Sequence, residues 1–107
     1  MSPDRQARLG ENEAIMRSVN ETVASVAKAT TMEPAVFLCE CAAGCGDSIR
    51  LTREAYEAVR AVPDHFFVTP GHVSLDVERV VEKQPDYWVV EKFGIAAEVA
   101  EATDPRS

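Results

Sequence analysis

The segment FLCECAAGCGD, Phe37–Asp47, contains all three cysteines of the chain, Cys39, Cys41 and Cys45. An odd number of thiols cannot all pair within one chain, and Cys39 and Cys41 are too close in sequence for an unstrained disulfide. In a reducing compartment, clustered cysteines are typical of metal binding or redox chemistry. The segment therefore predicts a local fold organised by a metal ion.

The residues around the cysteines predict two short strands joined by a glycine-rich turn. Residues 35–41 are apolar with β-formers in the middle, and residues 48–52 can form a second strand. Side chains two positions apart share a strand face, so Cys39 and Cys41 point the same way. The glycines on either side of Cys45 permit a tight turn that brings this residue back toward them. The three thiolates would then converge in a hairpin or knuckle.

A zinc ion would need one more ligand, because zinc is usually held by four Cys or His side chains in a tetrahedron. We expect His72, which lies in a PGH turn after a predicted strand. His65 is the alternative, with Asp64 beside it to orient the ring. Asp47, Glu40 or a water molecule are the remaining candidates, and a water would leave the site open to chemistry.

Other roles for the cysteines stay open. Iron–sulfur clusters use Cys thiolates and sometimes His, and the spacing here resembles the Cys3His clusters of the CDGSH proteins. In that family the last Cys and the His are close, as C-D-G-x-H, whereas no histidine follows Cys45 for many positions. Redox-active thiols and cysteines packed as small hydrophobes are two further explanations. Zinc is the predicted cofactor, with an iron–sulfur cluster as the alternative.

Residues 11–29 predict an amphipathic helix. Ile15, Val19, Val23 and Val26 recur at spacings of four, four and three, which makes one apolar stripe of the kind that packs on a core. The polar residues that lie off this stripe are Arg17, Asn20, Glu21 and Lys28.

The rest of the chain predicts a single α+β domain. Thr52 can cap a second helix that ends near Ala61. The predicted strands after it are 65–69, 77–83 and 86–92, followed by a short helix after Gly94. We expect an N-terminal helix and a second helix packed on a small antiparallel sheet, with a metal-stabilised knuckle. The expected organisation is a flexible segment at 1–10, the domain at 11–102 and a frayed end at 103–107.

Composition and charge limit the classes of partner that the protein can bind. The net charge is −7, and the densest basic group, Arg50, Arg53 and Arg60, is interleaved with glutamates. Phosphate binding needs clustered Lys and Arg, so we expect no nucleic acid. No run of about twenty apolar residues is present, and the N-terminal residues contain no apolar signal segment, so we expect a cytoplasmic protein that does not enter a membrane.

No catalytic signature accompanies the cysteines. The glycines do not match a phosphate-binding loop, and no third group is tied to a Cys–His pair apart from Asp64 beside His65. The sequence therefore predicts a non-enzymatic zinc-binding module with a regulatory role, acting through a protein partner, and leaves a homo-oligomer open. A thiol-based redox or metal sensor and a small metallo-enzyme are the alternatives.

The order of motifs resembles a family of small actinobacterial proteins that combine a C-x-C-x-x-x-C cluster with a PGH motif. The segments that carry the resemblance are ENEAIMRSVNETV, FLCECAAGC, IRLTREAYEAVR, HFFVTPGH, VERVVEKQPDYWVVEKFG and DPR. That family is uncharacterised, so the resemblance implies a fold unit and no activity. It also implies that Cys39, Cys41, Cys45 and His72 belong together.

Overall fold

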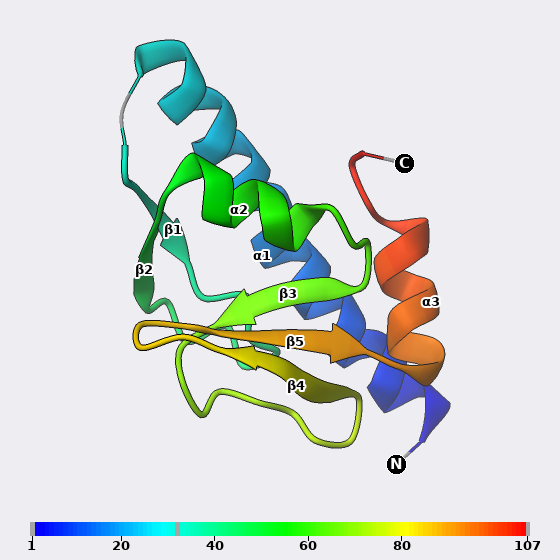
Figure 1. Cartoon of the computed structure of the whole chain (residues 1–107). Coiled ribbons are helices and arrows are strands. Elements are labelled where there is room, and N and C mark those ends of the chain that lie inside the picture. The colour runs from blue at the N-terminus through cyan, green and yellow to red at the C-terminus, as the bar shows by residue number, and fades with distance from the viewer. Residues whose placement is uncertain (1, 32, 107) are drawn as a thin grey trace.

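The computed structural model of the chain describes residues 2–31 and 33–106 and shows one α+β domain (Figure 1). This confirms the predicted fold class. Met1 and Ser107, which belong to the expected terminal segments, lie outside the described residues. The elements are α1 (Pro3–Thr30), β1 (Ala35–Leu38), β2 (Ser48–Leu51), α2 (Arg53–Arg60), β3 (His65–Val68), β4 (Glu78–Lys83), β5 (Trp88–Lys92) and α3 (Gly94–Ala102).

The strands form two antiparallel sheets where we expected one. β1 pairs with β2, and the second sheet has the order β3-β5-β4. The predicted strand 35–41 stops at Leu38, because Glu40 leaves the hairpin and donates its N–H to Phe67 O in β3 at 3.0 Å. The Glu40 carboxylate also accepts the Phe67 N–H at 3.3 Å. The cysteine segment therefore bridges the two sheets and covers the outer edge of β3.

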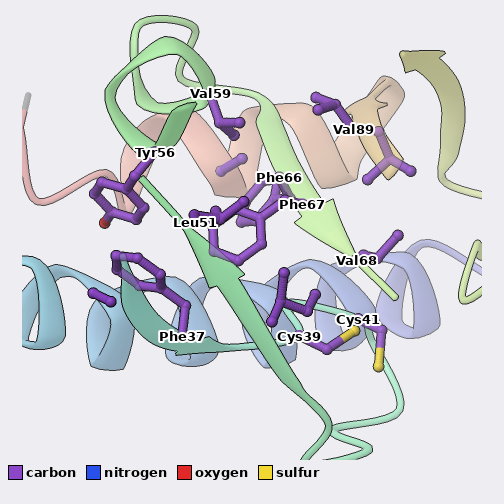
Figure 2. Packing of buried hydrophobic residues seen from close by; sticks show 14 residues of the cluster. Phe37, Cys39, Cys41, Leu51, Tyr56, Val59, Phe66, Phe67, Val68 and Val89 are labelled. Atoms are coloured by element: carbon purple, nitrogen blue, oxygen red, sulfur yellow. The ribbon is translucent and has the colours of Figure 1, made fainter. Parts of the chain in front are cut away.

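The core lies between the two sheets, α2 and α3. Phe37 and Tyr56 stack with ring centroids 4.5 Å apart, and Phe67 meets both rings edge-on at 5.9 and 6.0 Å. Figure 2 shows this aromatic group, with Cys39 and Cys41 at the border of the same cluster. Burying each such aromatic side chain contributes about 1.5–3 kcal/mol. The aromatic group therefore fixes the position of the segment that leads into the cysteines.

The orientation of α1 differs from the prediction. Ile15, Val19 and Val26 are 61%, 41% and 56% exposed, and Val23 is half-buried. The side of α1 that faces the domain carries small and polar residues: Gly10, Glu13, Ala14, Arg17 and Asn20 are all buried. The expectation that the whole stripe packs on the core is wrong: Val23 packs against the core cluster, but the other three residues are exposed. The apolar spacing identifies residues on one face but does not say where that face points.

Two buried polar side chains attach α1 to the domain. The Arg17 guanidinium donates to Pro63 O at 2.6 Å and to Ala100 O at 2.7 Å. The Asn20 side chain accepts the N–H of Leu38 at 2.9 Å and donates to its carbonyl at 2.8 Å, as a neighbouring strand would. Asn20 also donates to the buried Glu40 carboxylate at 2.9 Å. These contacts satisfy groups that would otherwise be costly to bury.

Replacing Asn20 with alanine is expected to destabilise the domain by about 2–3 kcal/mol, because three buried polar groups lose their partner. Urea unfolding followed by circular dichroism measures the loss. Ser18→Ala, on an exposed position of the same helix, is the control and should change stability by less than about 0.5 kcal/mol. Equal stability of the two variants would contradict the role given to Asn20.

Residues near both termini contact the rest of the domain. α1 begins at Pro3, capped by the Ser2 side chain, so residues 3–10 form its first turns. Gly10 is buried against α3, where an added Cβ would lie 3.4 Å from atoms of Ala96 and Val99. At the other end, two side chains of residues 103–106 form ion pairs. Asp104 accepts from Arg60 at 2.5 Å, and Arg106 pairs with Glu21 and Glu57 at 2.6 Å each.

Candidate metal centre

The structure brings together the four residues that the sequence predicts as ligands. The Sγ atoms of Cys39, Cys41 and Cys45 and a ring nitrogen of His72 all lie within 4.8 Å of one another. A tetrahedral zinc ion with bonds of about 2.0–2.3 Å holds its ligand atoms about 3.3–3.8 Å apart. The separation between Cys39 Sγ and His72 Nδ1 is 3.8 Å. The group is therefore close enough to hold a metal ion after small side-chain movements.

The hairpin turn carries Cys45 back to the other two thiols. The N–H of Cys39 donates to Asp47 O at 2.8 Å, which continues the β1–β2 pairing beyond the strands. Within the turn, Gly44 N donates to Cys41 O at 3.2 Å. Gly44 and Gly46 have φ values of +61° and +78°, which side chains other than glycine rarely adopt. The two glycines that flank Cys45 thus shape the turn, as the sequence predicted.

A second turn presents His72. Its N–H donates to Thr69 O at 2.9 Å, directly after β3. Thr69 N also donates to Cys39 Sγ at 3.1 Å, so the same turn contacts both His72 and a thiol. Gly71, with φ of +89°, completes the turn. This contact between Thr69 and Cys39 is a feature that sequence reasoning missed, and no signal beyond the turn sequence T-P-G-H points to it.

Asp47 lies behind His72 instead of among the ligands. One carboxylate oxygen is 3.8 Å from His72 Nε2, while His72 Nδ1 faces the thiols. The same Asp47 oxygen accepts the Thr69 hydroxyl at 3.3 Å. A carboxylate on the far ring nitrogen fixes the orientation of a ligating histidine and raises its basicity. Asp47, which the sequence left open as a ligand, is beyond hydrogen-bonding distance at 3.8 Å and would orient His72 once metal binding draws the two together.

Replacing Asp47 with alanine is expected to weaken metal affinity about 10-fold or more, with the fold retained. The reason is that His72 loses the carboxylate that orients its ring. Competition against a chromophoric chelator measures the affinity. Asp64→Ala is the control, because Asp64 lies in a separate group with His65 and should leave the affinity unchanged. Equal affinities of the two variants would contradict this role.

His65 is not near the thiols. It begins β3 and lies with Asp64 and Glu91 in a second group whose potential ligand atoms are within 4.8 Å of one another. His65 Nε2 is 2.9 Å from Glu91, and Arg79 contacts the same carboxylate at 2.7 Å. The guanidinium already neutralises Glu91 and would repel a cation, so this group is best described as an ion-pair cluster. The structure therefore pairs His72, and not His65, with the cysteines.

Glu40 is also separate from the ligand group, although it lies between Cys39 and Cys41 in sequence. Its carboxylate is fully buried and contacts Asn20 and Phe67 N. Burial raises the pKa of Glu40 to about 7, although the hydrogen bond from Asn20 opposes the shift. Glu40 thus anchors the cysteine segment to α1 and β3 and does not complete the metal centre.

The thiols differ in exposure and acidity. Cys39 and Cys41 are buried, Cys45 is exposed, and the His72 side chain is 35% exposed. Burial raises the pKa of Cys39 to about 12. Burial also opposes ionisation of Cys41, but hydrogen bonds with the Cys45 backbone and His72 lower its pKa to about 7. A bound cation would favour the thiolate form of all three, because metal binding releases thiol protons.

A cavity of the described residues lies elsewhere. It has a volume of about 700 Å³ and is formed by the C-terminal half of α1, α2 and the C-terminal residues. Tyr56 lines it, together with Arg106, which is already paired with Glu21 and Glu57. None of the four predicted ligands lines this cavity. The thiol cluster and this cavity are therefore separate sites.

Comparison of the chain with models of known protein families, with curated proteins and with solved structures finds no match. The resemblance to the actinobacterial family stays a prediction. Among the described residues, no helix combines the length and apolar character needed to cross a bilayer.

Proposed function

We propose that the chain is a zinc-stabilised module with a regulatory role, acting through a protein partner without catalysing a reaction. The observation that carries the proposal is the convergence of three thiols and one imidazole within 4.8 Å. Sulfur and nitrogen donors in this ratio suit zinc, and closed sets of four protein ligands are typical of structural zinc sites. With all four positions filled by the protein, no place is left for a reactive water.

The exposure of the turn supports a structural role for the metal. Residues 43–48 are all exposed, so this turn has no apolar anchor of its own. Pro70 and Gly71, in the turn that presents His72, are exposed as well. A metal held by Cys45 and His72 would tie these two surface turns to the buried Cys39 and Cys41. It would supply the cross-link that the small core does not provide.

A protein partner is favoured over nucleic acid by charge. The net charge of −7 repels phosphate and suits a basic or neutral protein surface. A zinc ion held by four protein ligands has no open position for a substrate. This also favours a role in which the domain binds another protein.

A sensor of oxidants or metals is the second candidate, because Cys45 is exposed while the other two cysteines are buried. An accessible thiolate is the type of cysteine that oxidants reach first. In this case hydrogen peroxide would oxidise Cys45 and release the metal.

Thiol labelling of the native protein separates the two candidates. For a closed zinc site, all three cysteines should label slowly until a chelator is added, and treatment with peroxide at low concentration should leave the metal bound. Rapid labelling of Cys45 before chelation, with loss of metal on mild oxidation, would support the sensor and contradict the structural module.

A further inference from the structure

The outer face of α1 carries three large apolar side chains that are exposed to solvent. Ile15, Val19 and Val26 are each more than 40% exposed, and Met16 lies half-buried beside them, whereas Val23 packs against the core. α1 runs along one side of the molecule (Figure 1), and its opposite face contacts α3 and β1. Single exposed apolar residues are common, but a contiguous group on one helix face marks an interaction site.

The spacing of this face is that of a coiled-coil seam. Apolar or small residues alternate at intervals of three and four, the pattern of heptad positions a and d. The seam consists of six exposed residues: Asn12, Ile15, Val19, Thr22, Val26 and Ala29. Such a seam packs against another helix with the same repeat. Asn12, at one end of the seam, donates to Ala42 O of its own chain at 3.2 Å, so the layers of Ile15, Val19 and Val26 would set the pairing.

The seam is complementary to itself when the second helix runs in the opposite direction. In that arrangement Ile15 lies opposite Val26 of the second copy, and Val19 lies opposite Thr22. The end layers combine Ala29 with Asn12, whose amide is already bonded to Ala42 O. The spacing of the seam residues is the same from the N-terminal end as from the C-terminal end. A two-fold symmetric interface requires this equivalence.

Charge selects the antiparallel arrangement. Arg5 and Arg8 continue the heptad repeat before Asn12, and both are exposed. Two parallel helices would place each of these arginines against the same arginine of the second copy. Two antiparallel helices place Arg8 near the C-terminal end of the other α1, which carries partial negative charge and is followed by Glu33. The macrodipoles of the two helices also oppose each other in this arrangement.

We infer that α1 pairs with α1 of a second copy as an antiparallel coiled-coil dimer along the seam. The seam covers residues 12–29, about 27 Å of helix at 1.5 Å per residue. An interface of this length is smaller than standard protein interfaces, so the expected dissociation constant is on the order of micromolar. Each copy carries a net charge of −7, so salt that screens their repulsion should strengthen the dimer.

Sedimentation velocity over a dilution series tests the dimer. The wild-type protein should shift from dimer to monomer on dilution, and Val19→Glu should be monomeric throughout, with at least about ten-fold weaker association, because it places a charge in the seam. Leu75→Glu is the matched control, since Leu75 is 76% exposed in a loop away from α1 and the charge change is the same. This variant should dimerise like the wild type.

Metal content and thermal midpoint of all three proteins show whether the fold is kept, and both substituted positions are exposed. A wild-type protein that is monomeric at every concentration would overturn the inference and leave the seam to a helix of another protein. Val19→Glu that dimerises as well as Leu75→Glu would overturn it too. Neither result depends on which metal the thiols bind.

Arg8→Ala tests the direction of the helices. In the antiparallel dimer the substitution removes an attraction to a helix C-terminus and should weaken association about two- to five-fold. In a parallel dimer it would remove repulsion between two arginines and strengthen association. A stronger Arg8→Ala dimer would therefore overturn the antiparallel arrangement.

Discussion

Replacing Cys45 with serine is expected to remove the metal and to lower the thermal midpoint by at least about 10 °C. Cys45 is exposed, and its Sγ accepts one long hydrogen bond from Asp47 N at 3.4 Å. Without a metal, exchange of sulfur for oxygen at such a position would change stability by less than about 0.5 kcal/mol. A structural zinc ion contributes about 10–16 kcal/mol of apparent binding free energy, so loss of one ligand has a large effect.

Circular dichroism melting and metal analysis of the Cys45→Ser protein measure this effect. The wild-type protein treated with chelator provides the control and should melt at the same temperature as the variant. Ser48→Ala, at another exposed position of the same hairpin, should behave like the untreated wild type. A Cys45→Ser protein that keeps its metal and its midpoint would show that the ligand set is wrong.

Replacing Lys92 with methionine is expected to destabilise the domain by about 3–5 kcal/mol. Lys92 lies in the core over the Phe66 ring and forms ion pairs with Glu13 and Glu78, and all three charged side chains are fully buried. Methionine matches the length of the lysine but leaves both carboxylates without their cation. Breaking a buried ion pair from one side is strongly destabilising, because the remaining charge has no solvent and no partner.

The loss of unfolding free energy in Lys92→Met should depend on pH. Burial raises the pKa of Glu78 already in the wild-type protein, and removal of the Lys92 cation raises it further, so in the variant this carboxyl takes up a proton on folding. A group that binds a proton more tightly in the folded state adds stability at low pH and loses that contribution as the pH rises. The deficit of Lys92→Met relative to the wild type should therefore shrink as the pH falls from about 7 to about 5.

Urea unfolding at both pH values measures the deficit. Lys28→Met is the control at an exposed lysine without an ion pair among the described residues, and it should cost less than about 0.5 kcal/mol. Adding Glu78→Gln to Lys92→Met should recover part of the loss, because one unpaired charge is removed. A deficit that is the same at both pH values would contradict the account of this ion-pair group.

The candidate metal centre was predictable because its residues carry a chemical signature. Cys39, Cys41 and Cys45 are close in sequence, and the flanking glycines mark the turn that brings them together. The fourth ligand was less certain, since His65 and His72 lie at opposite ends of the same short strand. Which end of β3 reaches the thiols depends on the contacts of Glu40 and Thr69 with β3 and Cys39, and these are invisible in a single sequence.

The orientation of α1 could not be predicted from its apolar spacing. The buried face carries Arg17 and Asn20, whose partners are backbone groups of Pro63, Ala100 and Leu38, far away in sequence. Hydrophobic periodicity assumes that the apolar side of a helix faces its own core. In this helix polar side chains with partners elsewhere in the domain occupy much of that side, and most of the apolar stripe is left at the surface.

The contacts of the terminal residues could not be predicted for the same reason. The composition of residues 3–10 is typical of a flexible segment, but Gly10 allows α1 to lie close to α3. Asp104 and Arg106 are ordered by Arg60, Glu21 and Glu57, residues of α1 and α2. Long-range ion pairs of this kind leave no local pattern in the sequence.

The most direct test of the metal centre is the elemental composition of the purified, untagged protein, measured by inductively coupled plasma mass spectrometry. The arrangement of Cys39, Cys41, Cys45 and His72 predicts one zinc ion per chain. Iron in place of zinc would support the iron–sulfur alternative. A folded protein that contains no metal and takes none up when zinc is added would contradict the account.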